Sequence, residues 1–148
     1  MYKNILIATD GSELAQGAVN HGLELAKRVG ATSILVTVTE QWSSLEMAGA
    51  AEGGQLDAVQ TYQDAAARSA EAILENAAST ARSMGVDFET RHVEDRSPAE
   101  GILETAELEE CDLIVMASHG RRGLGRMLLG SQTAEVLAHS KIPVLVLR

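Results

Sequence analysis

Five short hydrophobic runs, separated by longer amphipathic segments, dominate the pattern of this chain. They cover Ile5–Ala8, Ser33–Thr39, Val86–Val93, Asp112–Ala117 and Pro143–Leu147. The first, fourth and fifth runs contain stretches that are continuously apolar, which is typical of strands buried on both faces of a parallel sheet. The third run alternates and carries charge, which indicates an edge strand. The pattern therefore predicts five β-strands.

Helical segments fill the first two intervals between these runs. Ser12 is placed to cap the first helix, and Gly30 closes it. Its expected buried stripe follows intervals of three and four residues: Leu14, Ala18, His21, Leu25 and Val29. A second helix is predicted from about residue 57 to residue 84. It follows a long connection, 40–56, of a kind that is uncommon inside a compact domain.

The third helix has the clearest predicted start in the chain. Ser97 stands at the N-cap, Pro98 at the first helical position and Glu100 three residues after the cap, which forms a capping box. A last helix is predicted from about Ser131 to Ser140. Because strands and helices alternate along the whole chain, we predict an α/β fold with a mostly parallel sheet and helices on both faces.

The segment after the fourth run combines glycines with positive charge. Four of the 13 glycines lie within 120–130, between a buried strand and the start of a helix. Residues 113–134 contain three arginines (Arg121, Arg122 and Arg126) and no acidic residue. Backbone N–H groups freed by glycine, together with a helix N-terminus, favour an anion. A phosphate ligand is the simplest interpretation, and a solvated surface loop is the alternative.

Composition excludes several other classes of protein. The 148 residues carry a net charge of −9, and only 3% of them are aromatic. This combination argues against a nucleic-acid polymer as partner. No apolar run approaches a membrane span and the first residues do not resemble a signal peptide, so we expect no membrane contact and a cytoplasmic location. The single cysteine, Cys111, cannot form an internal disulfide, and we expect no redox role for it.

Two common phosphate-binding motifs are missing. A Walker loop needs a Gly-Lys-Ser/Thr ending, but no lysine lies between Lys27 and Lys141. The dinucleotide fingerprint would follow the first strand, where the chain instead reads Asp10-Gly11-Ser12. Simple dehydrogenase and P-loop hydrolase functions are therefore disfavoured.

Taken together, these motifs resemble those of the universal stress protein family over the whole chain, as one domain spanning residues 1–148. The opening 4–12 resembles the family's first strand and turn, and Ile142–Arg148 its last strand. The segment 117–131 resembles its ATP-binding signature, Gly-x2-Gly-x9-Gly-Ser/Thr, with Ala117 in place of the first glycine and with Gly120, Gly130 and Ser131 retained. The resemblance implies a doubly wound, Rossmann-like five-stranded sheet of order 3-2-1-4-5. The ligand crevice would lie between the first and fourth strands.

The resemblance also implies roles for individual residues around an adenine nucleotide, ATP or AMP. Asp10 would contact the ribose and a phosphate-bound Mg²⁺, and Val38 would recognise adenine through its backbone. Gly120, Gly130 and Ser131 would offer donors to phosphate, with Ser131 also capping the last helix. The remaining candidates would line the pocket or add donors: Ala8, Thr9, Met116, Ala117, His119, Arg121, Gln132 and Thr133.

No convincing catalytic set can be named, so a nucleotide-binding regulatory or switch module of the stress response is the preferred function. The alternatives are a slow Mg-dependent ATPase or phosphotransferase that uses Asp10, and a nucleotide-free interaction scaffold. Trp42 and Met47 in the long connection suggest a lid over the nucleotide. The apolar terminal strand Val144–Leu147 invites edge pairing, and the resemblance implies a homodimer through it.

Overall fold

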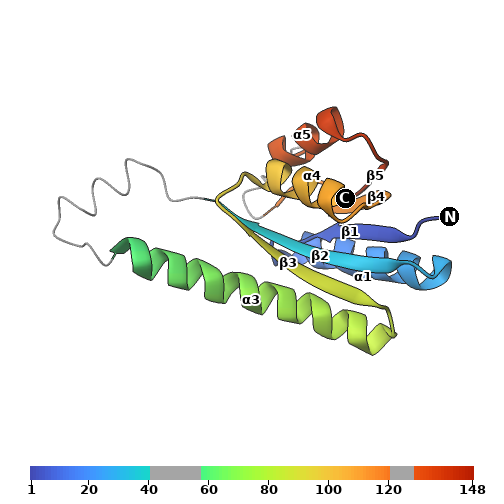
Figure 1. The fold of residues 1–148 in the computed structure, drawn as a ribbon, viewed down its shortest axis with the longest axis horizontal. Helices are drawn as coiled ribbons and strands as arrows, with labels where there is room; N and C mark the ends of the chain where they lie inside the picture. Colours follow the sequence, from blue (N-terminus) through green and yellow to red (C-terminus); the bar gives the residue numbers. More distant parts are fainter. Residues whose placement is uncertain (41–57, 121–128) are drawn as a thin grey trace.

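The computed structural model describes residues 1–40, 58–120 and 129–148. These residues form five strands and four helices that alternate along the chain (Figure 1). The strands are β1 (Asn4–Ala8), β2 (Thr32–Thr39), β3 (Phe88–Glu94), β4 (Leu113–Ala117) and β5 (Val144–Leu147). The helices are α1 (Glu13–Val29), α3 (Ala58–Met84), α4 (Pro98–Leu108) and α5 (Ser131–His139). Each lies within a few residues of its prediction.

All strand pairs are parallel, and the sheet has the order β3-β2-β1-β4-β5. This confirms the doubly wound topology and places β3 and β5 at the two edges. The longest paired segment joins β2 and β3, from Ser33↔Phe88 to Thr39↔Glu94. The pairing of β1 with β2 ends earlier, at Ala8↔Val36.

Helices cover both faces of the sheet, with α1 and α3 on one side and α4 and α5 on the other (Figure 1). Alternate residues of β1 divide between two cores because successive strand side chains point to opposite faces. Ile5 and Ile7 belong to the core under α1 and α3, whereas Leu6 and Ala8 belong to the core under α4 and α5. The continuous apolar character of β1 and β4 follows from this burial on both sides.

Local sequence accounts for most helix ends. Ser12 accepts a hydrogen bond from the Ala15 N–H at 3.2 Å, and Gly30 closes α1 in the left-handed conformation at φ +72°. The predicted stripe of α1 is confirmed except at His21: Ala18 is buried, and Leu14, Leu25 and Val29 pack half-buried against the core. Its buried residues are Ala15, Ala18, Val19, Gly22, Leu23 and Ala26, and His21 is exposed. Gly22 lets the helix lie close to the sheet, because a Cβ there would be 2.7 Å from Ile7 Cδ1.

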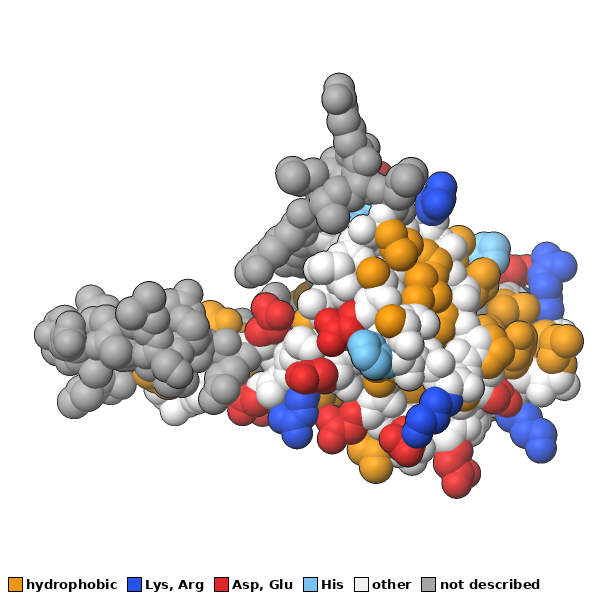
Figure 2. Space-filling view, turned by 90° about the horizontal axis from the view of Figure 1, so that it is seen from above, with side chains coloured by type: hydrophobic (Ala, Val, Ile, Leu, Met, Phe, Trp, Pro, Cys, Tyr) orange, Lys and Arg blue, Asp and Glu red, His pale blue; other side chains and the backbone are white. Residues whose placement is uncertain are grey.

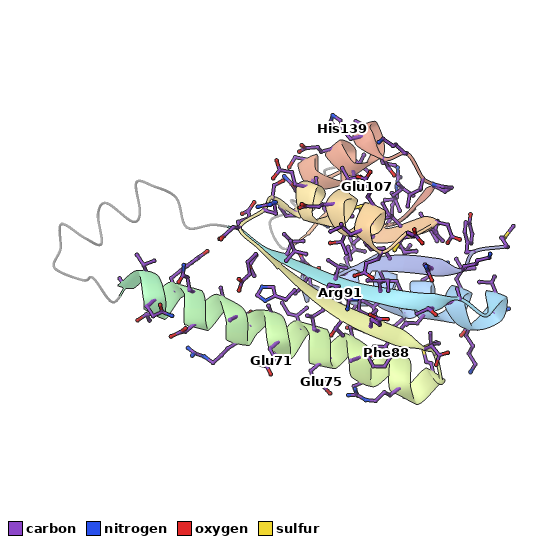
Figure 3. All side chains as sticks on the ribbon, viewed as in Figure 1. Glu71, Glu75, Phe88, Arg91, Glu107 and His139 are labelled. Atoms are coloured by element: carbon purple, nitrogen blue, oxygen red, sulfur yellow. The ribbon has the colours of Figure 1, made fainter. Side chains whose placement is uncertain are left out.

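Helix α3 is long, and its contact with the sheet is confined to its C-terminal half. Its buried residues begin at Ala70, whereas the part before it extends past the carboxyl ends of β2 and β3 (Figure 1). Glu71 and Glu75 point away from the sheet (Figure 3). Near the end of the helix, the Arg82 guanidinium lies 5.8 Å from the centre of the Phe88 ring, at the beginning of β3.

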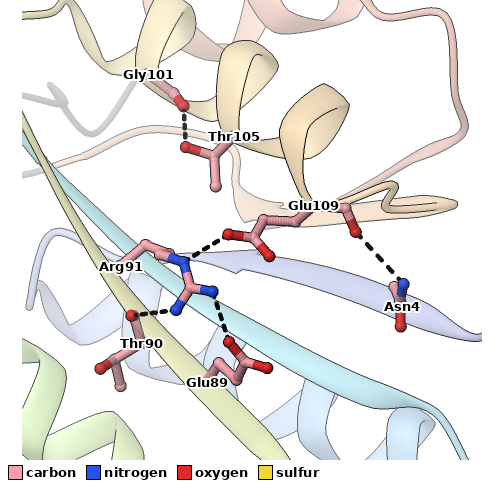
Figure 4. A network of polar contacts seen from close by, with 7 residues as sticks. All are labelled: Asn4, Glu89, Thr90, Arg91, Gly101, Thr105 and Glu109. Atoms are coloured by element: carbon pink, nitrogen blue, oxygen red, sulfur yellow. Dashed lines mark hydrogen bonds and ion pairs between the residues drawn. The ribbon is translucent and has the colours of Figure 1, made fainter.

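A polar network joins the β3 edge to the end of α4 (Figure 4). Arg91 on β3 donates to Glu109 and Glu89, each at 2.5 Å, and these bonds raise the pKa of Arg91. The Glu109 carbonyl accepts a bond from Asn4 Nδ2 at 3.4 Å, which connects the same point to β1. Asn4 begins β1 and Glu109 follows α4, so the network joins these two points to the middle of β3.

Figure 2 shows acidic side chains spread over the face that α4 and α5 cover, with hydrophobic side chains gathered on one flank. His139 and Glu107 lie on this outer face, at α5 and α4 (Figure 3). No helix in the described part of the chain is both long and apolar enough to cross a membrane.

Candidate functional site

The carboxyl ends of β1 and β4 open onto a cavity of about 140 Å³. These two strands are neighbours although they are distant in sequence, and the chain order of the sheet reverses between them. Such a reversal leaves a crevice because the connections from the two strands leave toward opposite faces. Strands β1, β2 and β4 supply one wall of the cavity, and the first turns of α4 and α5 supply another.

The structure brings ten of the thirteen predicted site residues into the lining of this cavity. They are Ala8, Thr9, Asp10, Val38, Met116, Ala117, His119, Gly120, Gln132 and Thr133. Gly130 and Ser131 stand beside it at the start of α5 but do not line it. Arg121 lies outside the described residues, as do Arg122, Arg126 and the predicted lid residues Trp42 and Met47.

Asp10 is held in a tight turn between β1 and α1. Its Oδ1 accepts a hydrogen bond from the Ser12 N–H at 2.9 Å, and Gly11 adopts φ +79°, a conformation that favours glycine. The preceding Thr9 is buried, and its N–H donates to the Val36 carbonyl at 2.9 Å. The turn therefore fixes one carboxylate oxygen of Asp10 and orients the other, Oδ2, toward the segment that follows β4.

Gly120 lies directly against this second oxygen. A Cβ atom at position 120 would be 2.5 Å from Asp10 Oδ2, which is closer than real Cβ contacts allow. A side chain at position 120 would therefore have to displace the Asp10 carboxylate, and glycine lets the backbone lie beside it. The polar end of the cavity is built by this pair together with His119, whose Nδ1 is 3.2 Å from Ser118 Oγ.

Gly130 closes the glycine segment onto β4. Its N–H donates to the Ser118 carbonyl at 2.7 Å, and a Cβ atom here would meet the His119 backbone at 3.1 Å. The expectation that the Gly130 N–H is offered to a phosphate is therefore wrong in this structure, because that donor is already used. The glycine serves a close contact between two backbone segments.

The predicted cap of the last helix is also wrong by one residue. Gly130 is the N-cap of α5 and has no side chain to accept a hydrogen bond, whereas Ser131 is the first helical residue. The hydroxyl of Thr133, which is buried, donates instead to the Ala117 carbonyl at 2.9 Å. This bond ties the first turn of α5 to the end of β4. The N–H groups of 131, 132 and 133 precede the first backbone bond of the helix, from Ala134 to the Gly130 carbonyl.

The N-terminus of α4, by contrast, is satisfied by the protein. Ser97 Oγ accepts from the Glu100 N–H, and the Glu100 carboxylate accepts from the Ser97 N–H, so the predicted capping box is confirmed. Pro98 has no N–H. The remaining donor, the Ala99 N–H, is bonded to Gln132 Oε1 of α5 at 2.9 Å. Two helix starts thus meet at the cavity, and within the described residues only the α5 start has N–H groups without a hydrogen-bond acceptor.

The other end of the cavity is apolar. Val36, Val38, Ile102 and Met116 line it between the sheet and α4. Helix α4 approaches Val38 closely because Gly101 faces it: a Cβ at 101 would lie 2.7 Å from Val38 Cγ2. The Val36 carbonyl accepts a hydrogen bond from the Thr9 N–H, so it faces β1. Val38 is two residues further along the strand, and alternate residues of a strand direct their backbone groups to the same side. Its N–H and C=O therefore face the β1 side, past the end of the β1–β2 ladder.

Sequence reasoning missed four lining residues, namely Ala15, Val36, Pro98 and Ile102. Val36 was open to prediction, because it shares a strand face with Val38. Pro98 and Ile102 carried a weaker signal, the capping box that begins α4, but its position over the β1–β2 end depends on helix packing. Among the described residues, no group of three or more His, Cys, Asp or Glu side chains is arranged to hold a metal ion.

The fold and this crevice define a doubly wound α/β protein with a pocket at the switch point of its sheet. The model of the universal stress protein family matches residues 1–148, and the chain belongs to this family. The universal stress protein MJ0531 of Methanocaldococcus jannaschii is 32% identical over 148 residues, which are 100% of this chain and 83% of that protein.

Solved structures agree with this assignment. The hypothetical protein MJ0577 has a TM-score of 0.82 at 31% identity, covering 99% of this chain and 96% of that one. A universal stress protein solved in complex with cAMP has a TM-score of 0.69 at 27% identity, covering 98% of this chain and 95% of that one. The predicted family is confirmed.

Proposed function

We propose that this protein binds an adenine nucleotide, ATP or AMP, in the cavity at the ends of β1 and β4, and acts as a regulatory module of the stress response. One observation supports the proposal most strongly: the same pocket contains an apolar wall and the start of α5, which has no side-chain cap. A similar universal stress protein has been solved with cAMP, an adenine nucleotide.

The apolar end suits the adenine base. Val36, Val38, Ile102 and Met116 offer aliphatic and thioether surface to a flat heterocycle. The backbone N–H and C=O of Val38 supply a donor and an acceptor side by side, which a purine edge can match. The scarcity of aromatic residues in the chain fits a base held by aliphatic side chains and backbone groups.

The polar end suits the phosphates. The first turn of α5 contributes the N–H groups of residues 131–133, together with the positive end of the helix dipole. The start of α4 is a poorer anion site, because its donors are bonded to Ser97 and Gln132. The proposal therefore assigns the phosphate group to α5.

Asp10 faces this polar end and is assigned the sugar hydroxyls. A carboxylate accepts hydrogen bonds from hydroxyl groups, and its Oδ2 lies at Gly120, on the cavity. A single carboxylate fits a Mg²⁺ ion that arrives with the phosphates, since Mg²⁺ is commonly held by one or two carboxylates and substrate oxygens. Such an ion would neutralise phosphate charge beside Asp10.

The edge strand β5 is assigned to a homodimer. Val144–Leu147 is entirely apolar and half-buried, and it lies at one edge of the sheet. Such an edge pairs readily with another strand. Light scattering at micromolar concentration tests this part, with a dimer mass expected and a monomer mass contradicting it. We place the protein in the cytoplasm, as expected from its composition.

Mass spectrometry of small molecules released from the purified, denatured protein tests the ligand class. An adenine nucleotide released in near-stoichiometric amount is the expected result. A tightly held compound without an adenine base would contradict the proposal. The same preparation, incubated with ATP and Mg²⁺, separates binding from turnover: the proposal expects nucleotide to be retained without multiple turnovers.

A further inference from the structure

Gln132 connects the two helix starts at the cavity in a manner that fixes its own orientation. The side chain is half-buried on the first turn of α5, and its Oε1 accepts from the Ala99 N–H of α4 at 2.9 Å. A backbone N–H can be served only by the carbonyl oxygen of a carboxamide, so the oxygen and nitrogen of Gln132 are distinguished by chemistry. The carboxamide oxygen of Gln132 must therefore be the atom that faces α4.

The other end of this carboxamide is a hydrogen-bond donor. Gln132 lines the cavity, and its Nε2 has no bond to any other described residue. The donor belongs to the same helical turn as the N–H groups of residues 131–133, which have no acceptor among the described residues. A planar group with one end anchored on α4 presents its NH₂ at low cost in side-chain entropy, because the rotamer is already fixed.

We infer that Gln132 is a specificity-determining residue of the pocket: anchored through Oε1 on the Ala99 N–H, it presents its NH₂ to a phosphate oxygen of the bound nucleotide. This inference rests on the proposed nucleotide binding. It adds a side-chain phosphate contact to the backbone donors of α5, and it predicts discrimination between nucleotide and nucleoside at this one position.

Calorimetric titration with AMP, ATP and adenosine tests the inference on two variants of the full chain. Gln132→Glu keeps an oxygen for the Ala99 N–H but replaces the NH₂ by a second carboxylate oxygen. Its affinity for the tighter-binding nucleotide falls by about 10- to 100-fold, as expected for the loss of a hydrogen bond to a charged group. Its affinity for adenosine changes less than about threefold, because adenosine has no phosphate.

Gln132→Met, of similar length, removes both interactions. The same loss of nucleotide affinity is expected, together with a fall in the thermal midpoint of about 2–4 °C that Gln132→Glu does not show, because the Ala99 N–H loses its partner. Gln63→Glu on exposed α3 is the matched charge control, with wild-type affinity and midpoint expected.

Three outcomes overturn the inference and leave the proposed function standing. If Gln132→Glu binds nucleotide within about threefold of wild type, the side chain makes no contact with phosphate. If the variant loses affinity for adenosine equally, the substitution acts on the pocket in general and not on a phosphate contact. If the thermal midpoint of Gln132→Met is unchanged, the bond from the Ala99 N–H to Gln132 does not hold the side chain in place. Wild-type protein that binds neither AMP nor ATP overturns the proposed function itself, and the inference with it.

Discussion

The carboxylate of Asp10 lies so close to Gly120 that a side chain at position 120 would have to displace it. A Cβ at position 120 would lie 2.5 Å from Asp10 Oδ2 and 3.6 Å from Asp10 Cγ. The two residues come from the ends of β1 and β4, which are adjacent in the sheet. The glycine of the family signature thus has a physical reason in this chain: it lets the segment after β4 reach the acidic turn after β1.

Gly120→Ala tests this relationship. The added methyl group displaces the Asp10 carboxylate, and we expect nucleotide affinity to fall about tenfold or more, since a hydrogen bond to a charged group is typically worth that much. Isothermal calorimetry measures the change. The matched control is Gly17→Ala on α1, where a Cβ meets nothing within 4 Å. It should bind as wild type does, and equal binding by both variants would show that the contact is unimportant.

Gly101→Ala tests the approach of α4 to the apolar wall. The new Cβ would lie 2.7 and 2.9 Å from the two methyl carbons of Val38, which is stiff because it is β-branched. Overpacking of this kind costs about 1–3 kcal/mol of unfolding free energy. Chemical denaturation should detect this loss, and calorimetry a weaker affinity for adenosine. Stability at or above wild type would contradict the close packing.

Removal of two buried hydroxyl groups should change the unfolding free energy in opposite directions. Ser33 Oγ is fully buried and has no hydrogen-bond partner among the described residues, so Ser33→Ala should raise the unfolding free energy by about 1 kcal/mol. Thr133 Oγ1 donates to the Ala117 carbonyl, so Thr133→Val should lower it by about 1–2 kcal/mol. Urea unfolding measures both. Destabilisation by Ser33→Ala as large as that by Thr133→Val would refute the assignment.

The thiol of Cys111 should be protected. Burial, followed by the nearby carboxylates of Glu109 and Asp112, raises its pKa to about 11 from the ordinary 9.0. Alkylation by iodoacetamide at pH 8 should therefore be about 100-fold slower in the folded protein than after denaturation, since the thiolate is the nucleophile. Fast alkylation of the folded protein would show that this side chain is accessible.

The same shift has a consequence for stability. Because the folded pKa lies above the unfolded one, the folded state keeps a proton that the unfolded state loses between pH 9 and about 11. The unfolding free energy attributable to this group is fully present below pH 9 and falls as the pH rises through that range. Cys111→Ala should show a shallower decline there, measured by urea unfolding at several pH values.

Much of the architecture was open to prediction from local patterns. The capping box at Ser97 and the cap at Ser12 fixed two helix starts, because their side chains act within three residues of their own position. The strand order needed the family resemblance, since periodicity does not say which strands are neighbours. The N-cap of α5 was predicted one residue too late, at Ser131 instead of Gly130, because both residue types favour the N-cap position.

The site was predictable where it follows a strand end and unpredictable where it depends on helix packing. Asp10 lies two residues after β1, and Gly120 lies three residues after β4. The bond between Ala99 and Gln132 joins residues 33 positions apart, and no short-range pattern announces it. Gly101 carried a faint signal, a glycine inside a helix, which often marks a close contact.

Calorimetric titration of the wild-type protein with ATP, AMP and cAMP tests the central claim most directly. Binding in the cavity at the ends of β1 and β4 predicts saturable heat from at least one of these nucleotides, with one site per chain, and a clear loss of affinity in Gly120→Ala. The absence of binding heat from all three, with no shift of the thermal midpoint at millimolar nucleotide, would contradict it.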